Sequence, residues 1–218
     1  TWCLLALAVI LMFVTRNQVL KENEYDWTQQ LEHEADKNTK IFEKQIQHLT
    51  YQLRGIVSLF RASQTISRSS FKTFITPLLK NNNFVHSIQW IPKVNKNQRN
   101  TKESLARKQG FLSFQFTTFT KESGIIPAPI KNEYFPIYFM EPYLGNESIL
   151  GFDISTQPNL LSSMNQARDS GQIVATNLEF WFHNHSKEMI ILFFAPLYKG
   201  DEIPNTIEAR KDSFLGSI

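Results

Sequence analysis

A long stretch without proline, residues 15–66, constrains the fold of this chain more than any other feature. It contains a single glycine, Gly55, so no strong helix-ending signal interrupts it. Apolar residues recur along its second half at alternating spacings of four and three, the heptad-like pattern of one helix face. These residues are Phe42, Ile46, Leu49, Leu53, Ile56 and Phe60. The pattern predicts one long helix over residues 15–66.

A helix of this length cannot be buried along its whole course, because about fifty helical residues extend roughly 75 Å. Its second half carries the apolar stripe, and we expect that half to pack on its own domain as well. Its first half has few apolar residues, namely Leu20, Trp27 and Leu31. Such a face suits a solvated stalk or a partner helix. We therefore expect a stalk helix over 15–66 that forms a parallel homodimer.

The first residues of the chain, 2–14, form an unbroken apolar run. A complete membrane span needs about 20 apolar residues, so we expect residues 1–14 to be the end of a transmembrane helix. The core of a secretory signal is the alternative, since it has roughly 7–15 apolar residues. No small-x-small cleavage site follows Val14, which favours the uncleaved span. Cys3, the only cysteine, lies in this run and excludes an intrachain disulfide.

The remainder of the chain predicts strands separated by short helices, which is an α+β fold. Period-two and continuous apolar runs predict strands at 84–94, 112–120, 133–140, 173–182, 189–198 and from Phe214 onward. Helices are predicted over 67–83, 95–109 and 159–170.

Glycine and proline place the breaks between these elements. Gly171 is the expected C-terminal end of the helix 159–170, and Pro77 with the asparagines after it is expected to end the helix 67–83. Pro136 has no N–H to donate, so the strand 133–140 is an edge strand or carries a bulge. Gly124 and two prolines predict a loop over 123–131.

The chain has few groups arranged for catalysis or metal binding. His183 and His185 share a face at i, i+2, which suits zinc, but no third ligand is set by spacing and we expect solvated loop histidines. Glu133, Glu141 and Asp153 are carboxylates that acid–base catalysis can use, although hydrogen-bonding or capping roles are favoured. We predict no catalytic residue, no metal and no cofactor.

One segment, 93–108, is strongly basic, with six lysines or arginines and one acid. A nucleic-acid surface is one interpretation. Aromatic residues do not interleave with these charges as a stacking platform requires. A solvated surface loop is therefore favoured, and we expect no nucleic-acid partner.

A series of short motifs occurs in a characteristic order. The strand 134–138 (YFPIY) is followed by Glu141-Pro142, and then by the segments GNE (145–147) and GFD (151–153). Further matches are the segment WIPKV (90–94), the pair Gly110-Phe111, the pair Ala167-Arg168 with Gly171, and the segment APLY (195–198). Over roughly 60–218 this series resembles the CHASE domain, a sensory module of bacterial histidine kinases and nucleotide cyclases and of plant cytokinin receptors.

The resemblance implies two PAS-like subdomains on the stalk helix. The membrane-distal, ligand-binding one covers 67–176, and a truncated membrane-proximal part covers 177–218. It also implies an extracytoplasmic sensor that detects an unknown small molecule, held in a bacterial inner membrane and facing the periplasm. The output domain is expected to be a diguanylate cyclase or a histidine kinase.

The ligand pocket is expected between the strand around Trp90 and the strand 134–140. A sensor pocket needs apolar walls with a few directional polar groups. The predicted binding residues are Trp90, Phe116, Asn132, Tyr134, Pro136, Tyr138, Gly151 and Asp153. Plant cytokinin-binding members have an acidic residue where this chain has Asn132, so we expect a ligand other than a cytokinin.

Two other functions remain as alternatives. The aromatic residues of the domain suit a module that binds a protein partner instead of a small ligand. A hydrolase is less favoured, because the chain has no phosphate-binding glycine loop and no nucleophile elbow.

Overall fold

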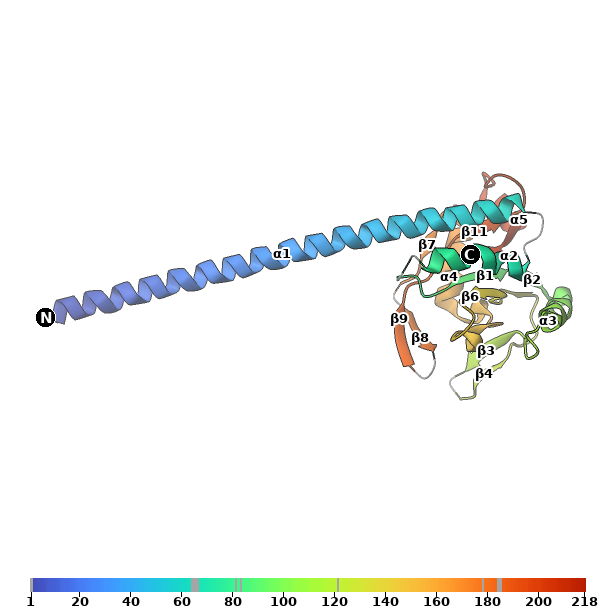
Figure 1. Cartoon of the computed structure of the whole chain (residues 1–218), viewed down its shortest axis with the longest axis horizontal. Helices are drawn as coiled ribbons and strands as arrows, with labels where there is room; N and C mark the ends of the chain where they lie inside the picture. Colours follow the sequence, from blue (N-terminus) through green and yellow to red (C-terminus); the bar gives the residue numbers. More distant parts are fainter. Residues whose placement is uncertain are drawn as a thin grey trace. The chain divides into compact units, whose positions relative to one another are not determined.

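The computed structural model describes residues 2–63, 67–80, 82, 84–120, 122–177, 179–183 and 186–218 (Figure 1). The chain divides into two compact units, residues 1–50 and residues 51–218. The first unit is helical throughout its described residues, and the second combines helices with antiparallel sheets. The predicted α+β fold with a long N-terminal helix is therefore confirmed.

Helix α1 (Trp2–Ala62) accounts for the long proline-free stretch. It ends four residues before the predicted boundary at Ile66. In the first unit the side chains of Trp27 and Leu31 are each 67% exposed. In the second unit Leu53, Ile56 and Phe60 are buried in the core. The heptad-like stripe is thus divided: its last three residues serve the fold of their own chain and are not free to pair with a second copy.

No helix within the described residues is both long enough and apolar enough to cross a membrane. The side chains of residues 1–10 lie outside the description. The expectation that residues 1–14 end a transmembrane helix stays a prediction.

A four-stranded antiparallel sheet forms the centre of the second unit. Its strands lie in the order β11 (Pro196–Tyr198), β12 (Phe214–Ser217), β1 (Ile88–Pro92) and β6 (Phe139–Glu141). β1 therefore has a partner on both sides: Trp90 is opposite Phe139, and Ile91 is opposite Ser217. β12, the last of these strands in sequence, is one of the two central strands. The sheet is therefore complete only when β12 has paired with β1 and β11.

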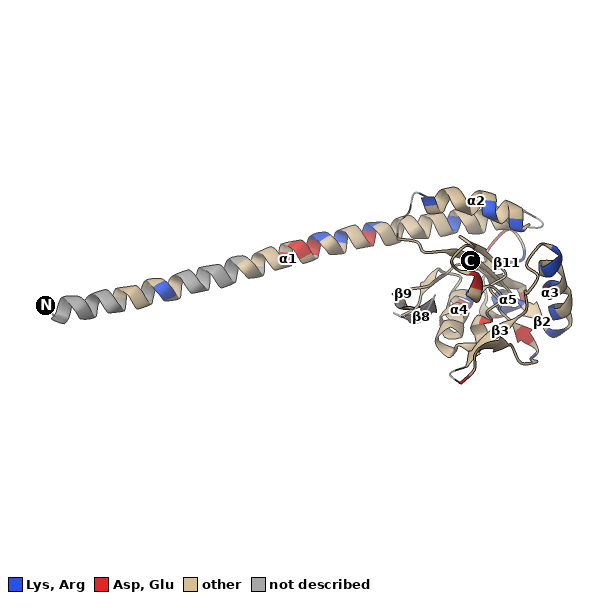
Figure 2. Ribbon diagram, turned by 60° about the horizontal axis from the view of Figure 1, so that its bottom comes forward, with Lys and Arg blue, Asp and Glu red and all other residues tan. Residues whose placement is uncertain are grey.

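One face of this sheet is covered by the last turns of α1 and by α2 (Arg68–Lys80), which lie next to each other (Figure 2). The ring of Phe60 lies 6.0 Å from that of Phe71 and 5.4 Å from that of Trp90. Phe71 also contacts Phe139, at 5.7 Å between ring centroids. This aromatic cluster of Phe60, Phe71, Trp90 and Phe139 joins both helices to the two strands β1 and β6.

Pro77 and the asparagines after it were expected to end the helix that follows Ser67. α2 does end at Lys80, directly before the asparagines, but the role given to Pro77 is wrong, because it lies inside the helix. A proline inside a helix removes one hydrogen bond and crowds the preceding turn. Burial of Phe71 and Ile75 holds the helix despite that cost.

The opposite face of the sheet is covered by α4 (Pro158–Ser170). Leu160, Met164 and Ala167 of α4 pack with Ile91 and Met140 of the sheet. Gly171 ends α4 with φ 74°, as its position in the sequence predicted. α5 (Ile207–Ser213) packs against α4 and leads into β12.

Four smaller hairpins or ladders complete the domain. β2 (Val94–Asn95) pairs with β5 (Glu133–Tyr134), and β3 (Thr117–Thr120) pairs with β4 (Gly124–Pro127). β7 (Val174–Ala175) pairs with β10 (Phe193–Phe194), and β8 (Glu179–His183) pairs with β9 (Ser186–Ile190). The helix predicted over 95–109 is the 3₁₀ turn η1 (Lys96–Gln98) followed by α3 (Arg99–Lys108). Two further 3₁₀ turns are η2 (Glu147–Ile149) and η3 (Ile154–Thr156).

The structure corrects three of the predicted elements. Residues 123–131 were expected to be a loop, but β4 pairs fully with β3, and its proline lies at the last position of a two-stranded ladder. Residues 112–116 were expected to begin a strand, but only 117–120 are paired. The strand predicted over 133–140 is divided into β5 and β6, and Pro136 makes only an isolated bridge with Asp153 between them.

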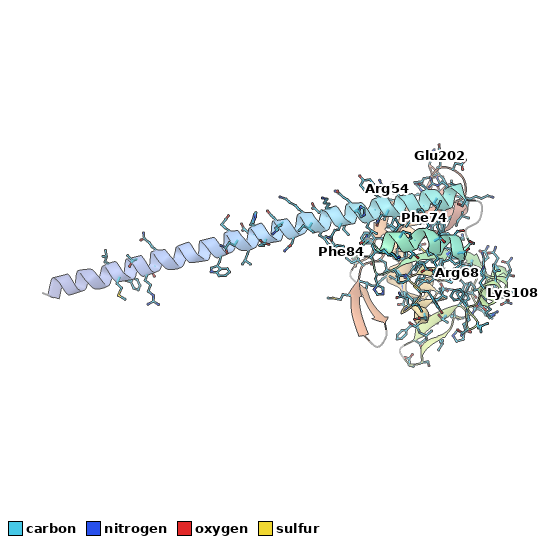
Figure 3. All side chains as sticks on the ribbon, viewed as in Figure 1. Arg54, Arg68, Phe74, Phe84, Lys108 and Glu202 are labelled. Carbon is cyan, nitrogen blue, oxygen red and sulfur yellow. The ribbon has the colours of Figure 1, made fainter. Side chains whose placement is uncertain are left out.

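Truncation of Phe71 tests the aromatic cluster. We expect Phe71→Ala to lower the free energy of unfolding by about 3–5 kcal/mol, the usual cost of deleting a buried aromatic ring. Phe74→Ala on the same helix is the matched control, because Phe74 is 37% exposed (Figure 3). Urea unfolding of both variants makes the comparison. Equal losses in the two variants would contradict the assigned role of Phe71.

Candidate functional site

An open hollow of about 530 Å³ lies where β2 leads into α3. Five polar residues line it: Asn95, Lys96, Asn97, Asn100 and Asn132. All five side chains are exposed. This hollow is the candidate functional site, and it contains one of the residues predicted from the sequence.

Local pairing explains why Asn132 lies beside residues more than thirty positions earlier in the chain. Asn95 of β2 is opposite Glu133 of β5. One residue further on, the Lys96 N–H donates to the Asn132 carbonyl oxygen at 2.9 Å. These backbone contacts hold the segment before β5 against the start of η1. The four asparagines and the lysine therefore share one surface.

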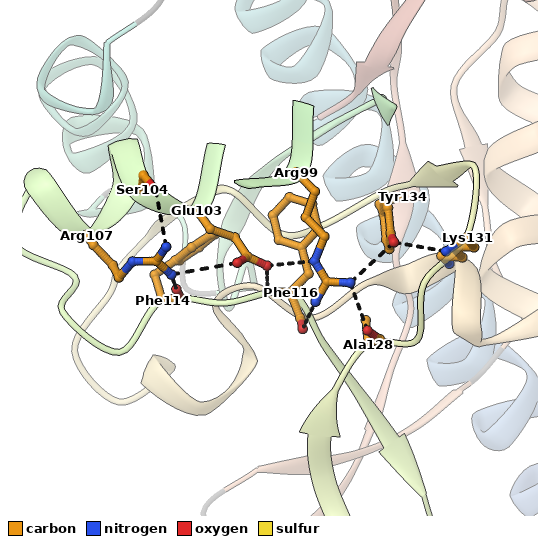
Figure 4. Close-up of polar contacts among 9 residues, drawn as sticks. All are labelled: Arg99, Glu103, Ser104, Arg107, Phe114, Phe116, Ala128, Lys131 and Tyr134. Atoms are coloured by element: carbon orange, nitrogen blue, oxygen red, sulfur yellow. Dashed lines mark hydrogen bonds and ion pairs between the residues drawn. The ribbon is translucent and has the colours of Figure 1, made fainter. Parts of the chain in front are cut away.

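A buried ion-pair network lies next to the hollow, on α3 (Figure 4). Glu103 Oε1 accepts from Arg99 Nε at 2.9 Å and from the Phe116 N–H at 2.9 Å. Glu103 Oε2 lies 3.7 Å from Arg107 Nη1. The side chains of Arg99 and Glu103 are only 15% and 11% exposed. A carboxylate with so little contact with water is stabilised by neighbouring cations, and Glu103 has two of them.

The two arginines carry this network to the neighbouring loops. Arg99 Nη1 donates to the Ala128 carbonyl oxygen at 2.8 Å and to the Tyr134 hydroxyl at 3.3 Å. Arg107 Nη1 donates to the Phe114 carbonyl oxygen at 2.7 Å. Burial acts to lower the pKa of Arg99, but its hydrogen bonds with Tyr134 and Glu103 outweigh burial and raise that pKa. Arg99 therefore stays charged and keeps α3 attached to the segments around Phe116 and Tyr134.

Asp153 forms a second buried ionic contact. Its Oδ2 lies 2.5 Å from Lys131 Nζ, which also contacts the Ser155 hydroxyl. Its Oδ1 accepts from the Phe135 N–H at 2.9 Å and from the Ser155 hydroxyl at 2.6 Å. These partners anchor the residue next to Asn132 to the start of η3. Asp153 is thus occupied within its own chain.

Several of the aromatic residues predicted to line a pocket do lie together. The ring of Phe116 is 5.4 Å from that of Tyr134 and 6.1 Å from that of Phe114, which in turn is 5.5 Å from Tyr138. All four are buried. Tyr138 also donates its hydroxyl to the Lys102 carbonyl oxygen at 3.0 Å. Trp90 is not part of this row, because it packs on Phe60 in the aromatic cluster beside α1.

The space predicted between the strand around Trp90 and the strand 134–140 is taken by direct pairing. β1 and β6 form a ladder, and the Tyr138 N–H donates to the Trp90 carbonyl oxygen at 2.9 Å. Gly151, with φ 90°, also makes a close approach, but to protein: a Cβ there would lie 2.2 Å from the Gln115 carbonyl oxygen. Pro136 is buried beside Asp153. Of the eight predicted binding residues, only Asn132 lines the hollow.

The structure corrects two expectations about exposed groups. Phe84, expected to begin the strand 84–94, is 72% exposed and precedes β1 (Figure 3). The basic segment 93–108 is not a solvated loop, since most of it is helical and Arg99 and Arg107 are tied to Glu103. The two arginines stand four residues before and after Glu103, and this spacing is the signal that identifies such a network on a helix.

No group of three or more potential metal ligands occurs in the described part of the chain. The side chains of the His183 and His185 pair lie outside the described residues. The expectation that they are solvated loop histidines stays a prediction.

The chain belongs to the CHASE domain family, whose model matches residues 64–218. This match covers the second unit from just after α1 to residue 218. The resemblance predicted from the ordered motifs is thereby confirmed.

Two curated relatives, both from Dictyostelium discoideum, are signalling proteins. The germination-specific adenylate cyclase is 31% identical over 110 residues, which cover 50% of this chain and 13% of that protein. The hybrid signal transduction histidine kinase A is 23% identical over 178 residues, which cover 78% of this chain and 8% of that protein. The chain therefore spans a small part of the length of these relatives. It is a sensory domain of the kind found in signalling receptors.

Removal of the Glu103 carboxylate tests the network beside the hollow. We expect Glu103→Ala to lower the free energy of unfolding by about 3–5 kcal/mol, because two arginines lose their common anion and the Phe116 N–H loses its acceptor. Glu122→Ala is the control, since Glu122 is exposed, and it should stay within about 0.5 kcal/mol of the unchanged protein. Chemical denaturation measures both. If Glu103→Ala leaves the free energy of unfolding unchanged, the network does not hold α3 in place.

Proposed function

We propose that this chain is the extracytoplasmic, ligand-sensing part of a membrane signalling receptor that controls a cytoplasmic output domain. The observation that carries the proposal is membership of the CHASE family, together with two relatives that are a nucleotide cyclase and a histidine kinase. The output domain proposed from the sequence is a diguanylate cyclase or a histidine kinase; one relative is a histidine kinase, and the other is a different nucleotide cyclase, an adenylate cyclase. The bacterial inner membrane remains the proposed location, with the sensor facing the periplasm.

The ligand in this proposal is a small molecule that binds in the polar hollow. Asn132 is the central residue, because its backbone accepts from the Lys96 N–H across the hollow and its side-chain amide can both donate and accept hydrogen bonds. Two contacts close to it in the chain hold its backbone in place: the Lys131 N–H donates to the Tyr134 hydroxyl, and Lys131 pairs with Asp153. A site built this way loses little conformational freedom when it binds.

Signalling would follow from a ligand-dependent balance between two arrangements of the domain. β2 leaves the hollow and follows directly on β1 in the chain, and Trp90 of β1 contacts Phe60 near the end of α1. A movement of η1 relative to the segment before β5 can therefore be transmitted to α1 through β1 and the contact between the Trp90 and Phe60 rings. The proposed domains are the stalk 15–66, a distal PAS-like subdomain over 67–176 and a proximal part over 177–218.

Substitution of Asn132 tests the proposed site. Native mass spectrometry first identifies a ligand that co-purifies with the domain, and thermal-shift titration then compares variants. We expect Asn132→Leu to weaken binding roughly ten- to a hundredfold, because a lost hydrogen bond with its partner left unpaired costs about 1–3 kcal/mol.

The matched control is Asn205→Leu, the same change at an exposed asparagine that does not line the hollow. Its affinity should equal that of the unchanged protein. If the Asn132→Leu variant binds the ligand as tightly as the unchanged protein does, the ligand site lies elsewhere.

A parallel homodimer through the stalk is the second part of the proposal. Leu31 and Trp27 are exposed in the first unit and are free to meet a second copy. In the full-length receptor in its membrane, with Cys3→Ser to remove the native thiol, Leu31→Cys should form a disulfide between two copies under mild oxidation. Gln29→Cys is the control, because two residues turn the helix by about 200°. Equal crosslinking at both positions, or none at either, would contradict a defined stalk interface.

A further inference from the structure

The polar hollow has an unbalanced charge. Of its five lining residues, Lys96 is ionisable and the other four are asparagines, so no carboxylate lines it. Asparagine amides donate hydrogen bonds to oxygen atoms as readily as they accept them. The lining therefore combines one full positive charge with several neutral donors.

Three carboxylates, which lie on α3 or β5 or contact Lys131 next to Asn132, are occupied by other cations. Glu133 pairs with Lys93 at 3.0 Å, and Glu103 pairs with both Arg99 and Arg107. Asp153 pairs with Lys131. Each anion is neutralised within the fold, and none is left to neutralise Lys96.

Lys96 differs from these cations, since it makes no ion pair within the described residues. Segment 93–108 carries six basic residues and one acid, which places further positive charge along α3 (Figure 2). A surface with an excess of one charge raises the local concentration of small ions of the opposite sign. The hollow is thus electropositive and has an unused cation at its edge.

We propose that the hollow selects a small anionic ligand that presents a carboxylate or a phosphate group. This inference rests on the proposed sensor function and names the ligand class of the same site. An oxyanion would accept from Lys96 Nζ and from the asparagine amides, and charge-assisted hydrogen bonds of this kind are the stronger ones. The volume of about 530 Å³ falls within the range of roughly 300–1,000 Å³ for small-molecule sites.

A neutral polyhydroxyl ligand is the competing occupant, because amides also bind hydroxyl groups. Lys96 distinguishes the two ligand classes. Its positive charge raises the affinity for an oxyanion and has little effect on the affinity for a neutral ligand. Binding in a hollow this open to solvent is expected to be of modest affinity for a small probe, since water screens the charge.

The experiment titrates the domain with inorganic phosphate, with succinate and with succinamide, the neutral analogue of succinate, at constant ionic strength. Amide resonances of residues 95–100 and of the Asn132 side chain report binding by NMR. Phosphate or succinate should shift these resonances, and succinamide should not. Whichever of the two anions binds more tightly distinguishes a phosphate from a carboxylate ligand.

Two charge-removing variants decide whether Lys96 acts at the site. Lys96→Gln should weaken binding of the anion about three- to fivefold, the upper part of the range for an exposed charge pair. Lys108→Gln removes the same charge from the far end of α3, outside the lining, and should change affinity by less than about 1.5-fold (Figure 3). Both lysines are exposed, so the fold of neither variant is at risk.

Three results would overturn the proposal. Equal weakening in the two lysine variants would mean that the whole basic segment attracts anions without a site. Equal shifts with succinate and succinamide would mean that charge is not recognised. No response to either anion would exclude the anionic class. If Asn132→Leu still weakens binding of a co-purified neutral ligand, the sensor function stands and the anion assignment alone fails.

Discussion

The carboxylate of Glu103 is the interaction on which the candidate site depends. It lies on α3, and its oxygens meet two arginines and a backbone N–H. Through Arg99 and Arg107 it reaches the carbonyl oxygens of Ala128 and Phe114. Segments with no regular ladder between them are therefore joined to one helix. Together with the pairing of β2 and β5, this network keeps α3 next to the segment before β5, and residues of both line the hollow.

Joining loops through buried charges has a high free-energy cost, since each charge loses its hydration. A buried pair contributes little net stability compared with apolar packing, but breaking it leaves an unpaired charge. The network therefore acts mainly as a constraint on geometry. Its consequence for function is a set of exposed amides on a rigid backbone, and a preorganised site binds with a smaller loss of entropy.

The central sheet separates two different tasks. On one face α4 buries Leu160, Met164 and Ala167 against the strands, and this layer supplies apolar stabilisation. On the other face the aromatic cluster joins β1 and β6 to α2 and the last turns of α1. β2 borders the hollow and follows directly on β1, whose Trp90 contacts Phe60 of α1. The sheet is thus the element through which a change at the hollow can reach the helix.

The sequence alone was sufficient where a local signal determines the structure. The proline-free heptad-like run predicted α1, Gly171 predicted the end of α4, and Pro136 indicated that the strand 133–140 is not a regular central strand. The ordered motifs predicted the CHASE family. Each of these signals is either a pattern of a few neighbouring residues or an order of motifs along the chain. Both kinds can be recognised without knowing which distant segments are in contact.

Only the tertiary structure decided the rest of the candidate site. Residues 124–127 resemble a loop by composition, and they form a strand because β3 offers them a partner. Arg99 and Arg107 resemble solvated charges, and they are held because Glu103 is buried beside Phe116. Asn132 was predicted as a binding residue, but its neighbours Asn95, Lys96, Asn97 and Asn100 were not. They come together through the pairing of β2 with β5, a contact between distant segments that no local pattern encodes.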